Sequence, residues 1–470
     1  MTRRPIPLRM PMVRLVGPLL LLTACTASIG DVAPPKFQPY FPTGMVLSPD
    51  ERWLFVLSAN SDLRYSTGAI QVIDMQKVDE IAAAWRGGGD SQAGIECAPI
   101  PGRPQVLGCP MQLSSGEPGA MVVRDGSVAL GNFGVSIGAQ QLKNGDQPTP
   151  IVRLFATVRG DPSVTWMDFD TQAQTMDCGG TDQFQRCADT HRLARLRNNA
   201  LLVGLPEEPF NLHVAGDNVF VTHFTNGYVS LFSAPAQVGA QPMLQDTIKN
   251  LWAQNVVGLA GAAGVASRPG DPSGLVYITS RQEARVAMLT VSDGVPIDQQ
   301  PKQSLVRAGW FYVSGVERPG QVGDTRDLRF SPDGNRAWVI SRLPPSMQLY
   351  DTTLDSRGQP INKLLGNVEV CEQPGSLEVT DVGDGPLVGV PCFVNGQVWF
   401  IDAESLGIVA VEESGRGPSG IVASRSRKKV IVGNYAEDTL SVIDIAPDSP
   451  DRFRVVLRLG RPRPLEEIFD

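Results

Sequence analysis

Residues 418–444, PSGIVASRSRKKVIVGNYAEDTLSVID, contain three short apolar runs separated by turn residues, and a fourth run follows at Val455–Leu459. Each run is short, four to seven residues, and rich in Val and Ile. Short β-branched runs bounded by Gly, Ser, Asn and Asp are typical of strands joined by tight turns. The stretch therefore predicts a four-stranded antiparallel meander.

The same unit opens the folded part of the chain. Residues 42–44 (PTG) correspond to residues 418–420 (PSG), and residues 72–74 (VID) correspond to residues 442–444 (VID). A four-stranded unit repeated at both ends of a long chain is the signature of propeller blades. The fold class predicted is all-β, a β-propeller of four-stranded blades over residues 42–460.

The second strand of each unit is the easiest to recognise and gives the blade count. Eight candidates occur, at Trp53–Ser58, Ser127–Asn132, Arg153–Val158, Asn218–His223, Leu275–Ser280, Arg336–Ser341, Leu387–Cys392 and Lys429–Asn434. A blade needs about forty residues, so Ser127–Asn132 and Arg153–Val158 are too close to belong to different blades. The prediction is seven blades, with longer insertions at 76–117, 135–150 and 170–208.

The ends of the repeat region predict how the ring closes. Each terminal blade can be completed from contiguous sequence, so we expect the first strand of blade one, Gly44–Ser48, to sit beside blade seven. Closure would come from packing of blade faces and not from a strand crossing between the termini. Residues 25–41 are expected to be a tether that buries almost nothing. Residues 461–470 are expected to be a C-terminal tail.

The first 24 residues have the features of an export signal. Four arginines precede an apolar run, Leu15–Leu22, which is too short to span a bilayer. The run ends in Leu22-Thr23-Ala24-Cys25, which resembles the bacterial lipobox, where a Cys is lipidated and becomes the mature N-terminus. The resemblance implies a lipid anchor on Cys25, and Thr26 in place of Asp implies the outer membrane. The alternative is an ordinary signal peptide followed by a chance Cys.

Six further cysteines predict disulfides. Fifteen connectivities are possible for six cysteines, but along the chain they lie as three local pairs: Cys97 with Cys109, Cys178 with Cys187, and Cys371 with Cys392. An even number in an exported protein favours disulfide bonds. No C-x-x-C spacing and no neighbouring His supports a metal site, and no cofactor is predicted.

The repeat resembles a known family. Val432-Gly433-Asn434-Tyr435 followed by Ser441-Val442-Ile443-Asp444 is similar to the YVTN-type β-propeller repeat, as is Ser331-Pro332-Asp333-Gly334. The resemblance extends over about residues 42–460 and shades into the lactonase-like and Tol-associated propellers. It implies the propeller fold, whereas the function varies among such proteins.

No nucleophile elbow, phosphate loop, dinucleotide fingerprint or zinc-protease motif is present in the sequence. Polar residues on predicted first strands, which line a propeller's central channel, are the candidates for chemistry. These are His213 in blade three, Asp327 in blade five and Glu378 in blade six. They could form a site of the lactonase type, or simply hold water in the channel. His223, at the end of a second strand, is expected to tether neighbouring strands.

The function favoured by these features is a lipid-anchored cell-envelope scaffold without enzymatic activity, which binds a protein or glycan partner through long, disulfide-braced loops. The alternatives are a lactonase-like or other hydrolase that uses the channel, and a small-ligand or metal-binding sensor, because fold alone does not decide function. The net charge of −8 becomes more negative without the arginines of the signal, and this argues against nucleic acid as a partner.

Overall fold

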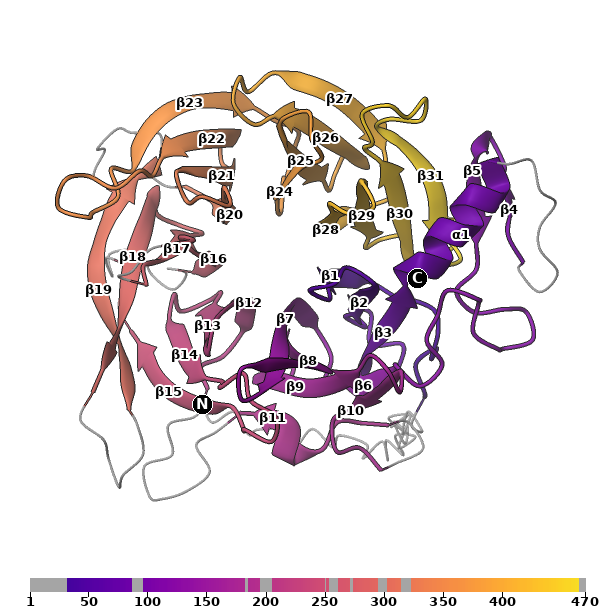
Figure 1. Cartoon of the computed structure of the whole chain (residues 1–470), viewed down its shortest axis with the longest axis horizontal. Helices are drawn as coiled ribbons and strands as arrows, with labels where there is room; N and C mark the ends of the chain where they lie inside the picture. The colour runs from indigo at the N-terminus through magenta and orange to yellow at the C-terminus, as the bar shows by residue number, and fades with distance from the viewer. Residues whose placement is uncertain are drawn as a thin grey trace, which may run out of the picture.

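The structure is a computed structural model that describes residues 32–86, 96–181, 185–194, 205–249, 251–252, 261–270, 274–294, 302–313 and 323–464. Seven antiparallel sheets follow one another around a ring (Figure 1). The four main strands of each sheet run from the centre of the ring to its rim in chain order (Figure 1). The prediction of a seven-bladed β-propeller is confirmed.

Four blades make up the N-terminal half of the ring. Blade one contains β1 (Pro42–Leu47), β2 (Trp53–Ser58), β3 (Gly68–Asp74) and β6 (Val128–Leu130). Blade two contains β7 (Gly134–Asn144), β8 (Gln147–Val158), β9 (Ser163–Asp170) and β10 (Thr175–Asp177), with β11 (Arg192–Leu193) also paired to β9. Blade three contains β12 (Pro209–Ala215), β13 (Asn218–His223), β14 (Val229–Ser233) and β15 (Met243–Ile248). Blade four contains β16 (Ala262–Ser267), β17 (Val276–Ser280), β18 (Arg285–Asp293) and β19 (Gln303–Tyr312).

Three blades complete the ring. Blade five contains β20 (Thr325–Phe330), β21 (Arg336–Arg342), β22 (Pro345–Asp351) and β23 (Lys363–Glu369). Blade six contains β24 (Glu378–Asp381), β25 (Pro386–Cys392), β26 (Gln397–Asp402) and β27 (Ile408–Glu413). Blade seven contains β28 (Pro418–Ser424), β29 (Lys429–Asn434), β30 (Thr439–Asp444) and β31 (Arg454–Leu459), and two more strands extend it at the rim.

Blade two is built differently from the prediction. The segment predicted as a second strand at Ser127–Asn132 contains β6, which pairs with β3 as the outermost strand of blade one. The first strand of blade two is β7, which lies in the stretch predicted as an insertion at 135–150. The sequence of β7, GVSIGAQQLKN, is interrupted by Gly, Ser and Gln, so it lacks the apolar run by which the other strands were recognised. The predicted count of seven is unaffected, because Ser127–Asn132 had not been counted as a separate blade.

Hydrogen bonds join the innermost strands of neighbouring blades. Thr43 Oγ1 of blade one donates to the Gly134 carbonyl of blade two (3.0 Å). Ser376 Oγ of blade six donates to the Ser419 carbonyl of blade seven (2.7 Å), and Ser419 Oγ donates to the Pro42 carbonyl of blade one (3.2 Å). β1 therefore lies beside β28, as predicted.

A strand from another blade also takes part in closing the ring, which corrects the expectation of closure by face packing alone. The insertion after β3 forms α1 (Met75–Arg86), β4 (Ala98–Ile100) and β5 (Arg103–Cys109). β5 pairs in parallel with β31, so blade seven becomes a six-stranded sheet (Figure 1). Val78 and Ile81 of α1 are buried in one core cluster with residues of blades one and seven, Val56 and Leu457 among them. Full burial of each such side chain contributes about 1.5–3 kcal/mol.

The last residues of the expected tether, directly before β1, are packed against the propeller and do not extend freely into solvent. Phe37, Tyr40 and Phe41 are buried, with 6%, 2% and 8% of their surface exposed. The Phe41 amide donates to Asp438 Oδ1 in blade seven (2.7 Å). Arg463, from the expected C-terminal tail, is buried and pairs with the same carboxylate (2.6 Å). The segment before β1 and the segment after β31 are therefore both bound to blade seven. No residue of the segment 36–41 belongs to a strand.

Within the described residues, no helix is long and apolar enough to cross a membrane.

Candidate functional site

Two of the three predicted channel residues, His213 and Glu378, lie at one level of the ring. In each blade the first strand pairs with the second in the same register, so positions can be compared between blades. His213 pairs with Phe220, Arg329 with Trp338 and Glu378 with Gly389. These partners lie three residues before His223, Ser341 and Cys392, the residues at which pairing with the inner segment begins. The equivalent residues in the other blades are Val46, Gly138, Ala266 and Val422. One level of the channel wall therefore carries a His, an Arg and a Glu among small or apolar residues.

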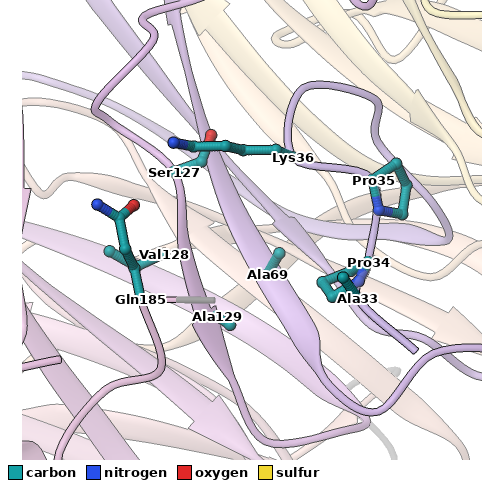
Figure 2. Close-up of a pocket in the computed structure, with 9 residues that line it drawn as sticks. All are labelled: Ala33, Pro34, Pro35, Lys36, Ala69, Ser127, Val128, Ala129 and Gln185. Atoms are coloured by element: carbon teal, nitrogen blue, oxygen red, sulfur yellow. The ribbon is translucent and has the colours of Figure 1, made fainter. Parts of the chain in front are cut away.

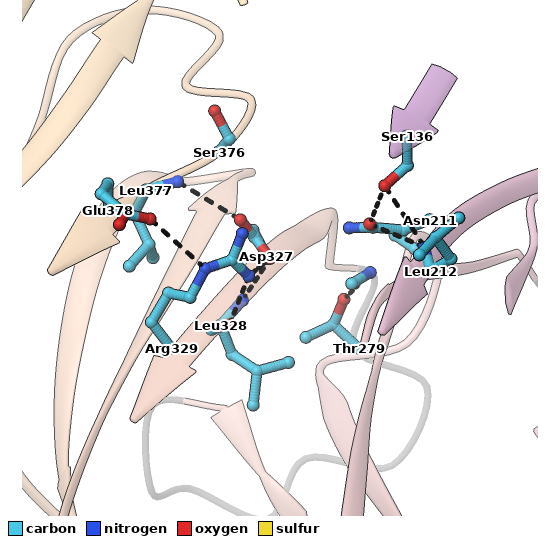
Figure 3. A network of polar contacts seen from close by, with 12 residues as sticks. Ser136, Asn211, Leu212, Thr279, Asp327, Leu328, Arg329, Ser376, Leu377 and Glu378 are labelled. Carbon is cyan, nitrogen blue, oxygen red and sulfur yellow. Dashed lines mark hydrogen bonds and ion pairs between the residues drawn. The ribbon is translucent and has the colours of Figure 1, made fainter. Parts of the chain in front are cut away.

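Asp327, Arg329 and Glu378 form one polar cluster (Figure 3). Arg329 Nη1 donates to Asp327 Oδ1 (2.7 Å), and Arg329 Nε lies 3.8 Å from Glu378 Oε2. Asp327 also accepts the backbone N–H groups of Leu328 (2.9 Å) and Leu377 (3.4 Å). The Asp327 carboxylate is thus held by three donors and in turn holds the guanidinium close to Glu378.

The exposure of these side chains shows which of them meets solvent. Asp327 is 2% exposed, whereas 36% of the Arg329 side chain and 23% of the Glu378 side chain are exposed. Both exposed groups lie on innermost strands, so the channel admits solvent at this level. A small molecule entering the channel would meet Arg329 and Glu378, with Asp327 behind them.

Close approach of two inner strands supports Asp327 from the other side. A Cβ on Gly264 of β16 would lie 2.7 Å from Asp327 Cα, too close for any side chain. Gly264 therefore permits β16 and β20 to lie against each other at the level of the cluster.

Burial shifts the pKa of both carboxyl groups. The surrounding protein raises the pKa of Glu378 to about 7, although Arg329 and the Ala423 N–H act to lower it. Burial also raises the pKa of Asp327, against the opposing effect of Arg329. A carboxyl group with a pKa near neutrality is suited to accept and return protons at physiological pH.

His213 is placed at the same level but is not bonded to the cluster. Its Nε2 lies 2.7 Å from Ser267 Oγ of blade four. Burial and, to a smaller extent, the Arg329 charge lower its pKa to about 4. His213 is therefore neutral at pH 7 and can act as a hydrogen-bonding group but not as a cation.

The other two histidines are structural. His223 is fully buried, its Nε2 lies 2.9 Å from Ser230 Oγ of the third strand, and its Nδ1 lies 3.1 Å from the Glu207 carbonyl. It tethers neighbouring segments, as expected. The ring centroid of His191 lies 4.0 Å from that of Trp166 in blade two.

All three predicted disulfides are present: Cys97–Cys109, Cys178–Cys187 and Cys371–Cys392. The predicted lipidation site, Cys25, lies outside the described residues. In the parts of the chain that the structure describes, no group of three or more His, Cys, Asp or Glu side chains could hold a metal ion.

A cavity of about 230 Å³ occurs elsewhere, on blade one (Figure 2). It lies between the segment 33–36 and β6, and Lys36 and Gln185 supply its longer polar side chains. No carboxyl group or His lines it. This cavity therefore lacks the carboxyl and imidazole groups that the channel supplies.

The sequence analysis identified His213, Asp327 and Glu378 but missed Arg329, which connects the two carboxylates. The signal was available, because Arg329 follows Asp327 by two residues on one strand and therefore faces the same side. The sequence could not predict that Arg329 lies close to Glu378, because the two residues belong to different blades.

The fold and the channel define this chain as a seven-bladed β-propeller with an ionisable cluster on its inner strands. No protein-family model and no curated protein sequence matches it. Among solved structures, a "putative 6-phosphogluconolactonase" from Bacteroides fragilis is similar with a TM-score of 0.53 and 13% identity, over 88% of this chain and 99% of that one. A protein from Lactobacillus plantarum is similar with a TM-score of 0.52 and 12% identity, over 87% and 97%. At such identities the likeness shows the fold alone.

Proposed function

We propose that the protein is a hydrolase of small lactones, or of similar cyclic esters, that works in the central channel. The observation that carries the proposal is the pairing of Glu378, whose pKa is raised to about 7, with the Arg329 guanidinium 3.8 Å away. The sequence favoured a scaffold because it showed only scattered acids and one His. The convergence of these groups on one level of the channel now favours an enzyme.

Glu378 would act as the general base. The ionised carboxylate takes a proton from a water molecule, and the resulting hydroxide adds to the carbonyl carbon of the ester. The ring C–O bond then breaks, and the leaving alkoxide receives the proton from Glu378. The products are the open-chain hydroxy acid and the regenerated carboxylate, so no cofactor is needed.

Arg329 would stabilise the negative charge that develops on the carbonyl oxygen. A guanidinium that is already oriented costs no reorganisation during the reaction. Asp327 supplies that orientation through its bond to Nη1. Asp327 is a positioning residue, since it is buried behind the exposed Arg329. His213, neutral beside Ser267, would offer a hydrogen bond across the channel.

The test is whether the purified protein hydrolyses any of a panel of unphosphorylated and phosphorylated lactones. The proton released by the acid product is the quantity measured. Glu378→Gln should lower kcat by about 10²-fold or more, and kcat of the parent should rise with pH through about 7. Glu413→Gln, at an exposed position on the rim strand β27, is the matched control and should leave kcat unchanged. Turnover that is equal in the Glu378→Gln and parent proteins, or absent on every lactone, would refute the proposal.

The second candidate is the cell-envelope scaffold that binds a protein or glycan partner. It is favoured by exposed apolar side chains on the rim strand of blade six: Ile408, Val409 and Val411 are 49%, 47% and 46% exposed. Crosslinking in intact cells, followed by identification of the captured molecules, tests this function. Loss of a specific crosslinked partner in a Val409→Asp variant would support it.

Both candidates are proposed to act in the cell envelope. The export signal and Cys25 lead us to propose a lipid anchor, with the outer membrane as destination. The membrane would then be a partner through the lipid alone.

A further inference from the structure

The register that aligns the channel residues also aligns a second ring of side chains. In each blade, one residue of the second strand pairs with the start of the first strand, as His223 pairs with Pro209 in blade three. The residue that comes next in the chain, Phe224 in that blade, belongs to the second ring. These residues therefore lie on one face of the disc, around the mouth of the channel. In blades one to seven they are Ala59, Arg159, Phe224, Arg281, Arg342, Phe393 and Tyr435.

Arginines from blades two, four and five lie around one aromatic ring of blade three at this mouth. The guanidinium carbons of Arg281, Arg326 and Arg159 lie 4.3, 5.1 and 5.7 Å from the centroid of Phe224. The Phe210 ring stacks on Phe224 with centroids 4.3 Å apart. Arg326 comes from the innermost strand β20, so the group reaches the edge of the channel.

Positive charge exceeds negative charge in this group. Glu208 is bound by Arg159 and Thr225, and these hydrogen bonds lower its pKa in spite of the opposing effect of burial. Asp324 is bound by Arg326 through two contacts, of 2.5 and 2.7 Å. Within the described residues, the Arg281 guanidinium forms no close ion pair and no hydrogen bond, although its charge helps to lower the pKa of Glu208.

Arg342 adds a further positive charge to the same group; within the described residues it forms no close ion pair, and only the more distant charge of Asp324 opposes the lowering of its pKa. Its Nε donates to the Pro374 carbonyl (3.0 Å), which carries no formal charge. Burial, together with Arg326 and Arg281, lowers the pKa of Arg342 to about 10. Neighbouring arginines repel one another, and a protein with a net charge of −8 has ample carboxylates elsewhere. An excess of guanidinium groups at one mouth is consistent with a place for an external anion.

We propose that this arginine group, Arg159, Arg281, Arg326 and Arg342 around Phe224, binds the oxyanion of a small molecule, either a phosphate or a carboxylate. Arg281 supplies the free guanidinium donors, and Arg342 supplies charge beside it. Bidentate pairing of guanidinium with oxyanions is geometrically favoured. The proposal does not rest on hydrolysis in the channel, because none of these arginines belongs to the Glu378 cluster.

The test is calorimetric titration of the full chain with inorganic phosphate and, separately, with citrate at low ionic strength. At least one anion should bind, and Arg281→Gln should weaken that binding about tenfold, as expected for the loss of a charge-assisted hydrogen bond. Phosphate alone would identify a phosphate site, and citrate alone would identify a carboxylate site.

Two control variants keep the test specific. Arg357→Gln removes an arginine whose side chain is 83% exposed. Arg357 follows the C-terminal end of β22, whereas Arg342 precedes the start of that strand, so the substitution should leave anion binding unchanged. Glu378→Gln should also retain binding, which separates this site from the proposed function. Binding of equal strength in the Arg281→Gln protein, or no binding of either anion to the parent at millimolar concentration, would overturn the proposal.

Discussion

Replacing Asp438 with Ala should test how the ring is closed. The Asp438 carboxylate accepts the Phe41 amide from the N-terminal segment (2.7 Å). It also accepts Arg463 Nη2 (2.6 Å) and Nε (2.9 Å) from the C-terminal segment. The guanidinium of Arg463 in turn lies 3.8 Å from the Phe41 ring centroid. One side chain of blade seven therefore holds the segment before β1 and the segment after β31.

The magnitude follows from burial. The side chains of Arg463 and Asp438 are 6% and 13% exposed. Removing the Asp438 carboxylate breaks this buried ion pair and leaves Arg463, among the described residues, with the longer contact of its Nη1 to Asp62 Oδ2 at 3.7 Å. Breaking such a pair costs about 3–5 kcal/mol. Asp438→Asn keeps an acceptor for the Phe41 amide and should cost less. Asp438→Ala combined with Arg463→Met removes both charges and should recover most of the loss.

Urea unfolding followed by tryptophan fluorescence measures these differences, and limited proteolysis before β1 reports whether the N-terminal segment is released. Glu80→Ala is the control, because Glu80 and its partner Lys77 are 50% and 49% exposed and such a pair contributes little. A loss below about 1 kcal/mol in Asp438→Ala, with no new cleavage before β1, would refute the view that this carboxylate latches the ends.

Four other perturbations have defined outcomes. The protein should become less stable as pH rises from 4.5 to about 7, because in this window only the folded state keeps the proton on Glu378. Glu378→Gln should abolish this contribution, which is up to about 3 kcal/mol. Urea unfolding of both proteins at several pH values measures it, and parallel pH profiles would contradict it. Replacing Cys97 and Cys109 together with Ser should cost about 2–4 kcal/mol and free the β31 edge for aggregation, seen by unfolding and light scattering; unchanged values in both would be inconsistent with a role for β5 in closure. Cys25→Ser should release the protein from membranes, and an equally membrane-bound variant would exclude the lipid anchor. The purified protein should hold no stoichiometric metal; one metal per chain, lost in His213→Ala, would instead favour the sensor function.

Local features of the sequence predicted most of the blades. Each blade is an antiparallel meander whose strands are joined by short turns, so its contacts are close along the chain. The alternation of Val and Ile runs with turn residues therefore encoded the strands, and closely spaced cysteines encoded the disulfides. The same locality placed His213, Asp327 and Glu378 on first strands.

Contacts between distant segments were decided only by the tertiary structure. The parallel pairing of β5 with β31 joins residues about 350 positions apart, and no local pattern in either strand indicates the partner. The latch at Asp438 and the approach of Arg329 to Glu378 likewise depend on which blades the ring makes adjacent. The pKa of Glu378 is raised because residues of several blades bury its carboxyl group. Those residues are far from Glu378 in the sequence, so the sequence alone does not predict the shift.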